Sequence, residues 1–159
     1  MILKGELSMS IVTKFAKMVP EAVIPKYAKP GDAGMDLYAL EGQVIPGNAR
    51  GIMIKTGLKV WLPKHFELQV RPRSGMSAKT TIRVANAPGT VDEGYTGEVC
   101  VLVDNLSNED FHIDADNRRI AQAVIKEVPV IEIEEISIED MDKRVTERGT
   151  GGFGSTGRG

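Results

Sequence analysis

A short connection between two apolar runs carries both an acid and an aromatic residue. In the stretch ANAPGTVDEGYTGEVCV, residues 85–101, the connection DEGYTG places Asp92 and Tyr95 close together. Such a connection is typical of a hairpin, in which Asp and Gly are favoured at the turn positions. Asn86 offers both a donor and an acceptor, which suits the imide edge of a pyrimidine. The stretch is therefore either a plain hairpin or a site that reads a base and positions an acid.

A cation, a hydroxyl and a glycine follow one another in RPRSGMSAK, as Arg73, Ser74 and Gly75. Arginine is the preferred planar partner of a phosphate group, and glycine lets backbone approach a ligand closely. Residues 74–79 could form a helical turn whose N–H groups would add to such a contact. The segment predicts a phosphate site, with a surface loop as the alternative.

Two weaker motifs lie near the expected starts of strands. In PGDAGMDLYA, residues 30–39, Asp36 stands between two apolar residues, so its side chain faces opposite to them. It either points into a cleft or caps a turn. In RRIAQA, residues 118–123, an arginine and Gln122 flank the opening of an apolar strand.

The last motif, RGTGGFGSTG, lies in a glycine-rich end of the chain. It offers backbone N–H groups, two hydroxyls and Phe153, but it lacks the Gly-Lys-Ser/Thr of a P-loop. A terminal segment of this kind is mobile unless something holds it. It is either a disordered tail or an arm that closes over a phosphorylated aromatic ring.

Composition limits the classes of protein to which the chain can belong. Its 159 residues make one ordinary domain, and a net charge of −2 argues against a surface that neutralises many nucleic-acid phosphates. The single cysteine, Cys100, excludes an internal disulfide and a multi-cysteine metal site. No apolar run approaches the ~18 residues of a membrane span, and the N-terminus lacks a secretory signal. We expect a protein of the reducing cytoplasm.

Short runs rich in Val, Ile and Thr recur between turn residues, which predicts an all-β sandwich or barrel. The predicted strands cover residues 10–19, 34–39, 52–62, 66–71, 82–85, 98–103, 111–113, 120–128 and 129–138.

Taken in order, five segments resemble the five motifs of the trimeric deoxyuridine triphosphatases (dUTPases). They are AGMDLYA, RPRSG, NAPGTVDEGYTGE, RIAQ and RGTGGFGSTG, and they span residues 33–157. The resemblance implies a distorted jelly-roll-like β-barrel over residues 1–142, with residues 1–9 as an N-terminal extension. Residues 143–159 would form a flexible arm, exchanged within a homotrimer, that closes over the active site.

The same resemblance implies an activity. The family hydrolyses dUTP to dUMP and pyrophosphate, with Mg²⁺ bound through the triphosphate. Its three active sites lie at subunit interfaces, and each draws on all three chains. Such an enzyme limits uracil incorporation into DNA and supplies dUMP for thymidylate synthesis. Its partners would be dUTP and other copies of the chain, with no stable nucleic-acid binding and no membrane.

Residue roles carry over by position. Asp92 matches the acid that activates the attacking water, and Gln122 a polar residue near the phosphates and that water. Asp36 matches the acid that holds metal-bound waters, and Tyr95 the ring under the deoxyribose. Asn86 and the hairpin backbone match the uracil reader. The implied substrate-binding residues are Arg73, Ser74, Gly75, Asn86, Gly89, Thr90, Val91, Tyr95, Cys100, Arg148, Phe153, Gly154, Ser155 and Thr156.

Two other functions stay open. A dCTP deaminase shares the fold, but that family carries a catalytic Glu about ten residues beyond the acid, where this chain has Leu102, and commonly a Trp at the position of Tyr95. The other is a dUTPase-like regulatory binding protein without catalysis.

Overall fold

The computed structural model describes residues 11–147 and 149–150 of the chain. It contains eleven β-strands and two short helices within that part, so the prediction of an all-β fold is confirmed. None of these helices has both the length and the apolar character needed to cross a bilayer.

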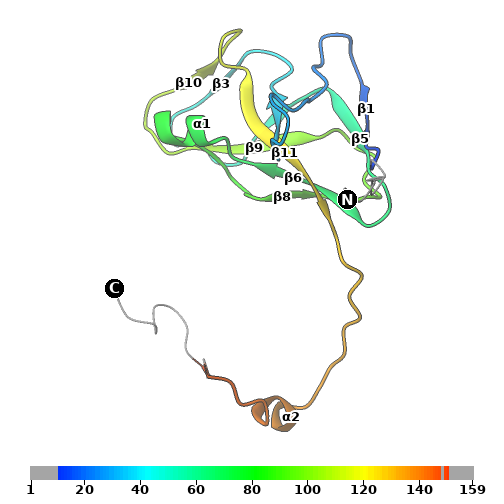
Figure 1. Cartoon of the computed structure of the whole chain (residues 1–159). Helices are drawn as coiled ribbons and strands as arrows, with labels where there is room; N and C mark the ends of the chain where they lie inside the picture. Colours follow the sequence, from blue (N-terminus) through cyan, green and yellow to red (C-terminus); the bar gives the residue numbers. More distant parts are fainter. Residues whose placement is uncertain (1–10, 148, 151–159) are drawn as a thin grey trace, which may run out of the picture. The chain divides into compact units, whose positions relative to one another are not determined.

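The central sheet has four antiparallel strands in the order β2 (Met35–Tyr38), β11 (Arg119–Glu127), β6 (Phe66–Arg71) and β8 (Gly89–Val91) (Figure 1). Gln122 on β11 lies opposite Asp36 on one side and Arg71 on the other. Since directly opposed residues project from the same face of a sheet, these three polar side chains form a row. One face of this sheet therefore carries polar groups from three neighbouring strands.

The opposite face of the central sheet is apolar because successive side chains of a strand alternate between faces. Leu37, Leu68 and Ala123 on that face are fully buried. They pack in one cluster with residues of the second sheet, such as Ile54 and Val101. Burial of each large aliphatic side chain contributes about 1.5–3 kcal/mol, so this two-layer core fixes the polar face that it supports.

The second sheet and two strand pairs complete the fold. The second sheet has the order β4 (Ile52–Lys55), β9 (Cys100–Asn105) and β7 (Ile82–Val84). β1 (Lys14–Lys17) pairs with β5 (Leu58–Trp61), and β10 (Phe111–Ile113) pairs with β3 (Gln43–Ile45). The helix α1 (Ser74–Lys79) occupies the residues for which a helical turn was expected.

Two of the predicted strands are wrong. Residues 52–62 form two strands, β4 and β5, because the chain turns at Gly57, whose φ of +69° favours glycine. Residues 129–137 form no strand, although their alternation of apolar and acidic residues is typical of one. Alternation alone does not make a strand, because a strand also needs a partner for its backbone hydrogen bonds.

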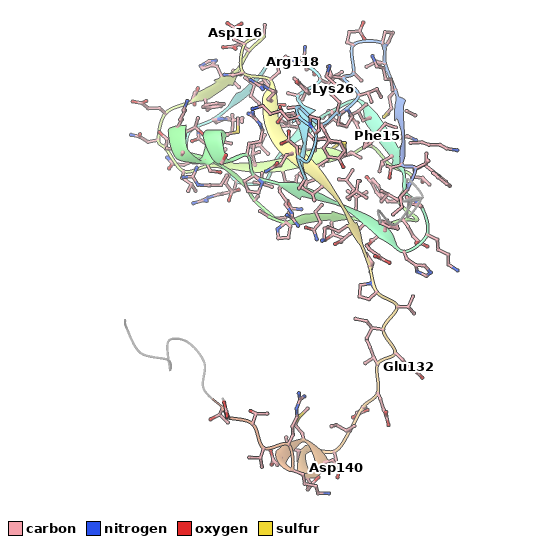
Figure 2. The ribbon with its side chains drawn as sticks, viewed as in Figure 1. Phe15, Lys26, Asp116, Arg118, Glu132 and Asp140 are labelled. Atoms are coloured by element: carbon pink, nitrogen blue, oxygen red, sulfur yellow. The ribbon has the colours of Figure 1, made fainter. Side chains whose placement is uncertain are left out.

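The chain divides into two compact units, Met1–Pro129 and Val130–Gly159. The second contains α2 (Ile138–Asp142), which Ser137 caps by accepting a hydrogen bond from the Asp140 N–H at 3.1 Å. Figure 2 shows Glu132 on the extended stretch of this unit and Asp140 on the helix. The Ser-x-x-Asp spacing is the sequence signal for this helix, which the strand prediction over residues 129–138 did not take into account.

Candidate functional site

A cavity of about 460 Å³ opens beside residues 92–99, which join β8 to β9. β8 pairs with β6, and β9 pairs with β4 and β7, so this connection, which we call the hairpin, joins two sheets and is not the paired β-hairpin that the sequence predicted. Six of the residues that the family resemblance assigned to catalysis or to the nucleoside line it: Asn86, Thr90, Val91, Asp92, Tyr95 and Cys100. Glu98 and Val99, from the predicted base-reading stretch, also line it, as do Met53, Lys55 and Leu102, to which the prediction gave no place in the site. Leu102 is close to the earlier group in the sequence, whereas Met53 and Lys55 reach it only because β4 pairs with β9.

Glycines allow two close contacts in the wall of this hairpin cavity. A Cβ at Gly89 would come within 3.0 Å of the Asn86 side-chain amide, so the glycine leaves room for that amide. A Cβ at Gly97 would overlap the ring of Tyr95. The Tyr95 hydroxyl donates to the Glu98 carbonyl oxygen at 3.0 Å, which fixes the ring against the hairpin.

The carboxylate of Asp92 is exposed and accepts no hydrogen bond in the described part of the chain. Its backbone carbonyl accepts from the Tyr95 N–H at 3.0 Å, which closes the turn. A carboxylate with free lone pairs at the edge of a cavity can accept a proton from a bound water.

Cys100 is the other reactive group in this cavity. Burial raises the pKa of its thiol, the Glu98 carboxylate raises it further, and Lys55 opposes both. The thiolate is the nucleophilic form, so a thiol with a raised pKa is a poor nucleophile near neutral pH. The chemistry of the cavity therefore centres on Asp92.

A second cavity, of about 440 Å³, is built on the polar face of the central sheet. Asp36, Arg73, Ser74, Gly75 and Gln122 line it, which brings together the residues assigned to the phosphates and the metal. Lys26, Asp32, Gly34 and Arg119 also line it. Its three cations exceed its two carboxylates, so the cavity suits an anionic ligand.

Asp36 holds the two arginines of this phosphate cavity. One carboxylate oxygen accepts from Arg73 Nε at 2.7 Å, and the other lies 3.4 Å from Arg119 Nη1. Arg73 Nη1 also donates to the Arg119 carbonyl oxygen at 3.0 Å. These contacts fix the Arg73 side chain and leave its Nη2 without a protein partner in the described part of the chain.

The side chain of Gln122, like that of Arg73, is held in one orientation by its contacts. Its Nε2 donates to the Pro72 carbonyl oxygen at 2.9 Å, so its amide oxygen is the free end. That oxygen lies against Gly34, where any Cβ would overlap it. The glycine in AGMD therefore has a specific purpose, which is to make room for the amide of a residue on a neighbouring strand.

Sequence reasoning missed Lys26 and Asp32, and it gave no role to Arg119. Asp32 and Arg119 stand inside quoted motifs, whereas Lys26 lies between Pro25 and Tyr27 with no signal of its own. In the described residues, no group of three or more His, Cys, Asp or Glu side chains could hold a metal ion. Arg148, Phe153, Gly154, Ser155 and Thr156, which were assigned to the arm, lie outside the residues that the structure describes.

The two cavities share no lining residue, so one chain does not gather its nucleoside and phosphate groups into one cavity. A third cavity, of about 580 Å³, includes Ser74 and Gln122 together with Ala87 and Pro88. It lies between the phosphate residues and the turn that follows Asn86.

Comparison with known proteins gives a consistent result. A family model described as dUTPase matches residues 20–157. The deoxyuridine 5'-triphosphate nucleotidohydrolase of Clostridioides difficile is 46% identical over 145 residues, which are 91% of this chain and 96% of that protein. The protein of the same name from Nautilia profundicola is 47% identical over 146 residues, covering 91% of this chain and 98% of that protein.

The fold is also that of a solved dUTPase. The dUTPase of Staphylococcus bacteriophage 80alpha superposes with a TM-score of 0.82 over 94% of this chain and 100% of that chain, at 24% identity. At this identity the likeness concerns the fold, which is jelly-roll-like, while the family model and the curated relatives concern the sequence. The family model and the curated relatives show that the chain belongs to the dUTPase family.

Proposed function

We propose that this chain hydrolyses dUTP to dUMP and pyrophosphate. The observation that carries the proposal is the hairpin cavity, where the unpartnered carboxylate of Asp92 stands beside Asn86 and Tyr95. Family membership supports the same substrate, because the curated relatives are named deoxyuridine 5'-triphosphate nucleotidohydrolases.

The hairpin cavity would select the nucleoside. The Asn86 amide and the backbone from Gly89 to Cys100 would pair with the imide edge of uracil. A cytosine in the same place would leave buried polar groups unpaired, at a cost of roughly 1–3 kcal/mol for each. The Tyr95 ring would lie under the deoxyribose, where a 2′-hydroxyl finds no room.

The phosphate cavity would take the triphosphate. Arg73 presents its free Nη2, and Ser74 and Gly75 add a hydroxyl and a backbone N–H from the start of α1. Charge-assisted hydrogen bonds of this type are roughly twice as strong as neutral ones. The free amide oxygen of Gln122 would accept from a water near the α-phosphorus.

Asp92 would act as the general base. Its carboxylate takes a proton from water while the water oxygen bonds to the α-phosphorus. The bond from that phosphorus to the bridging oxygen breaks, and pyrophosphate leaves. Such a displacement needs no covalent intermediate with the protein, so positioning and charge stabilisation dominate the catalysis.

The dUTPase family is metal-dependent, and Mg²⁺ is the ion that we propose here. The phosphate cavity offers two carboxylates, Asp32 and Asp36. This donor set fits Mg²⁺, which is usually held by one or two carboxylates, several waters and substrate phosphates. Asp36 would hold it through water. Bound Mg²⁺ would neutralise charge on the triphosphate.

A homotrimer with shared active sites explains the separation of the two cavities. If the hairpin cavity of one chain faces the phosphate cavity of a neighbour, the two halves meet at the interface. The second unit supports the assembly, because its apolar side chains Val130, Ile131 and Ile133 are 80%, 72% and 93% exposed. Side chains this apolar favour burial against another copy.

The remaining parts of the proposal follow the family. Residues 143–159 would form the arm, and Arg148, Phe153, Gly154, Ser155 and Thr156 would close over the base and the γ-phosphate. The match to the family model, which extends to residue 157, supports this assignment. The reaction would keep uracil out of DNA and supply dUMP for thymidylate synthesis, and we propose the cytoplasm as its location.

One assay tests the reaction. The chain is incubated with Mg²⁺ and dUTP, dCTP, dTTP or UTP, and pyrophosphate is measured. We expect release from dUTP alone, and no dUTP-dependent release would refute the proposal. Deamination of dCTP would favour the deaminase, although Leu102 makes the wall apolar where that family carries Glu.

A variant of the base tests the mechanism in the same assay. Asp92→Asn should keep binding dUTP while kcat falls by about 10²–10⁴-fold, the usual contribution of a general base. Near-normal turnover in this variant would contradict the role of Asp92. Binding of dUTP without turnover by the unmodified chain would favour the regulatory protein.

A further inference from the structure

The residue after the catalytic acid holds the hairpin to the rest of the fold. Glu93 projects its carboxylate to the turn that joins β5 to β6, where it accepts a hydrogen bond from the His65 N–H at 2.5 Å. Within the described residues, this is the one hydrogen bond that joins residues 92–97 to a distant part of the chain. The others, from the Tyr95 N–H and the Tyr95 hydroxyl, stay inside the hairpin.

The strand before Asp92 provides little support of its own. β8 has three residues and pairs with β6 alone, and its last matched pair is Val91 with Leu68. The chain therefore leaves the sheet one residue before Asp92. A short edge strand of this kind is free to fray unless side chains hold its end.

The far end of the hairpin is held by several bonds. The Glu98 carboxylate accepts from the Gly57 N–H at 2.7 Å, and the Val99 N–H donates to the Leu58 carbonyl oxygen at 2.8 Å. Thr56 Oγ1 adds a bond to the Val99 carbonyl oxygen. Loss of one bond at that end leaves the others, whereas the end that carries Asp92 depends on Glu93.

The point to which Glu93 binds is itself fixed. His65 has a φ of +67°, a conformation that is uncommon outside glycine. Its carbonyl oxygen accepts from the Val128 N–H at 2.7 Å, and its neighbour Phe66 lies opposite Glu127 at the end of β11. The His65 turn is thus part of the central sheet, and Glu93 ties the hairpin to that sheet.

We infer that Glu93 is a positioning residue, which holds the Asp92 carboxylate in place by accepting the hydrogen bond of the His65 backbone N–H. The imidazole of His65 takes no part in this contact. The inference deepens the proposed function and rests on it for the kinetic readout.

The test compares four variants with the unmodified chain. Glu93→Ala removes the acceptor, and Glu93→Gln keeps an acceptor oxygen. His65→Gly keeps the N–H and suits the positive φ. Glu41→Ala is the control, because Glu41 is exposed and makes no hydrogen bond or ion pair in the described part of the chain. The readouts are kcat and KM for dUTP and the thermal midpoint.

We expect Glu93→Ala to lower kcat about tenfold or more, because misplacement of a reacting group by ~1 Å can cost ~10²-fold. KM should change by less than kcat, within about threefold, since Asn86, the β6–β8 ladder and the phosphate residues lie outside the loosened residues 92–97. Glu93→Gln should recover most of kcat, and His65→Gly and Glu41→Ala should match the unmodified chain. Unchanged kcat in Glu93→Ala would overturn the inference. So would equal losses in the alanine and glutamine variants.

Hydrogen–deuterium exchange gives a readout that does not need activity. In Glu93→Ala, the amides of residues 92–97 should exchange faster, while those of the β6–β8 ladder keep their rates. Unchanged exchange at residues 92–97 would contradict the inference. If the unmodified chain does not hydrolyse dUTP, the proposed function fails, and the exchange measurement still decides whether Glu93 holds the hairpin.

Discussion

Two adjacent arginines have different structural roles. Arg118 donates from Nε to the Ala39 carbonyl oxygen at 2.8 Å and from Nη2 to that of Leu40 at 2.6 Å. Arg119 instead contacts Asp36 in the phosphate cavity. Figure 2 shows Arg118 near the start of β11. The first arginine secures the entry to β11, and the second adds positive charge to the phosphate cavity.

Gly34 allows a prediction about a single residue. Gly34→Ala should lower dUTP turnover about ten- to a hundredfold, because the new methyl group displaces the Gln122 amide. The thermal midpoint should change little, since Gln122 can turn towards the open cavity. Steady-state kinetics and thermal unfolding of the purified variant measure both effects.

A double-mutant cycle is the control for this prediction. In a Gln122→Ala background the amide is absent, so Gly34→Ala should cost little further activity. Equal effects of Gly34→Ala in both backgrounds would show that the glycine acts by another route.

Among the elements, one carboxylate adds to the pairing of β4 with β9. Asp104 on β9 accepts from the Gly51 N–H at 2.8 Å and pairs with Arg50 at 3.1 Å. The Gly51 hydrogen bond, followed by Arg50, holds the pKa of Asp104 below its ordinary value of 3.8. Asp104 thus joins β9, which lines part of the hairpin cavity, to the two residues that precede β4.

This lowered pKa predicts a dependence of stability on pH. A carboxylate whose folded pKa is depressed stabilises the fold above its unfolded pKa, and that contribution is lost as pH falls through the folded value. Between pH 6 and pH 3, Asp104→Asn should therefore lose less free energy of unfolding than the unmodified chain. Denaturant unfolding at the two pH values measures the difference. Asp116→Asn, at an exposed turn, should lose as much as the unmodified chain.

The elements also show what could be predicted from the sequence. The two predicted strands that match residue for residue, β6 and β10, have turn residues on both sides. β8 was missed because a strand of Gly89, Thr90 and Val91 has no local periodicity and depends on its pairing with β6. The hydrogen bond between Glu93 and His65 could not be predicted from the sequence either, since it joins residues 28 positions apart.

The quoted motifs contain most of the residues that line the two cavities, but they give no sign that the cavities are separate. Asp92 and Arg73 belong to different cavities in one chain, a separation that depends on the path of the whole chain. Lys26 gave no signal because its place in the phosphate cavity depends on how the loop before β2 folds.

For the whole molecule, the proposed trimer with shared active sites predicts that two inactive variants restore activity to each other. Asp92→Asn and Arg73→Ala should each be inactive alone. Refolded together at equal amounts, the two variants should recover about one quarter of the normal activity. About three quarters of the random trimers contain both variants, and about one site in three of such a trimer has both Asp92 and Arg73 intact. Pyrophosphate release from dUTP measures the recovery, and sedimentation gives the oligomeric state.

No recovery in mixed trimers would show that both residues act within one chain. A mixture of Asp92→Asn with Asp92→Asn tagged at the N-terminus is the control, because every site in it lacks the base. Recovery in that mixture would point to a contaminating activity.

The exposed alternation of apolar and acidic residues in the second unit has a consequence for a newly made chain. Without intervening charges, the exposed apolar side chains of this segment would favour β-pairing with the same segment of other chains. These side chains are Val130, Ile131, Ile133, Ile136 and Ile138. Glu132, Glu134 and Glu135 interrupt the segment, and stacking these acids in register between identical chains places like charges together. We therefore expect these carboxylates to protect a newly made chain from aggregation.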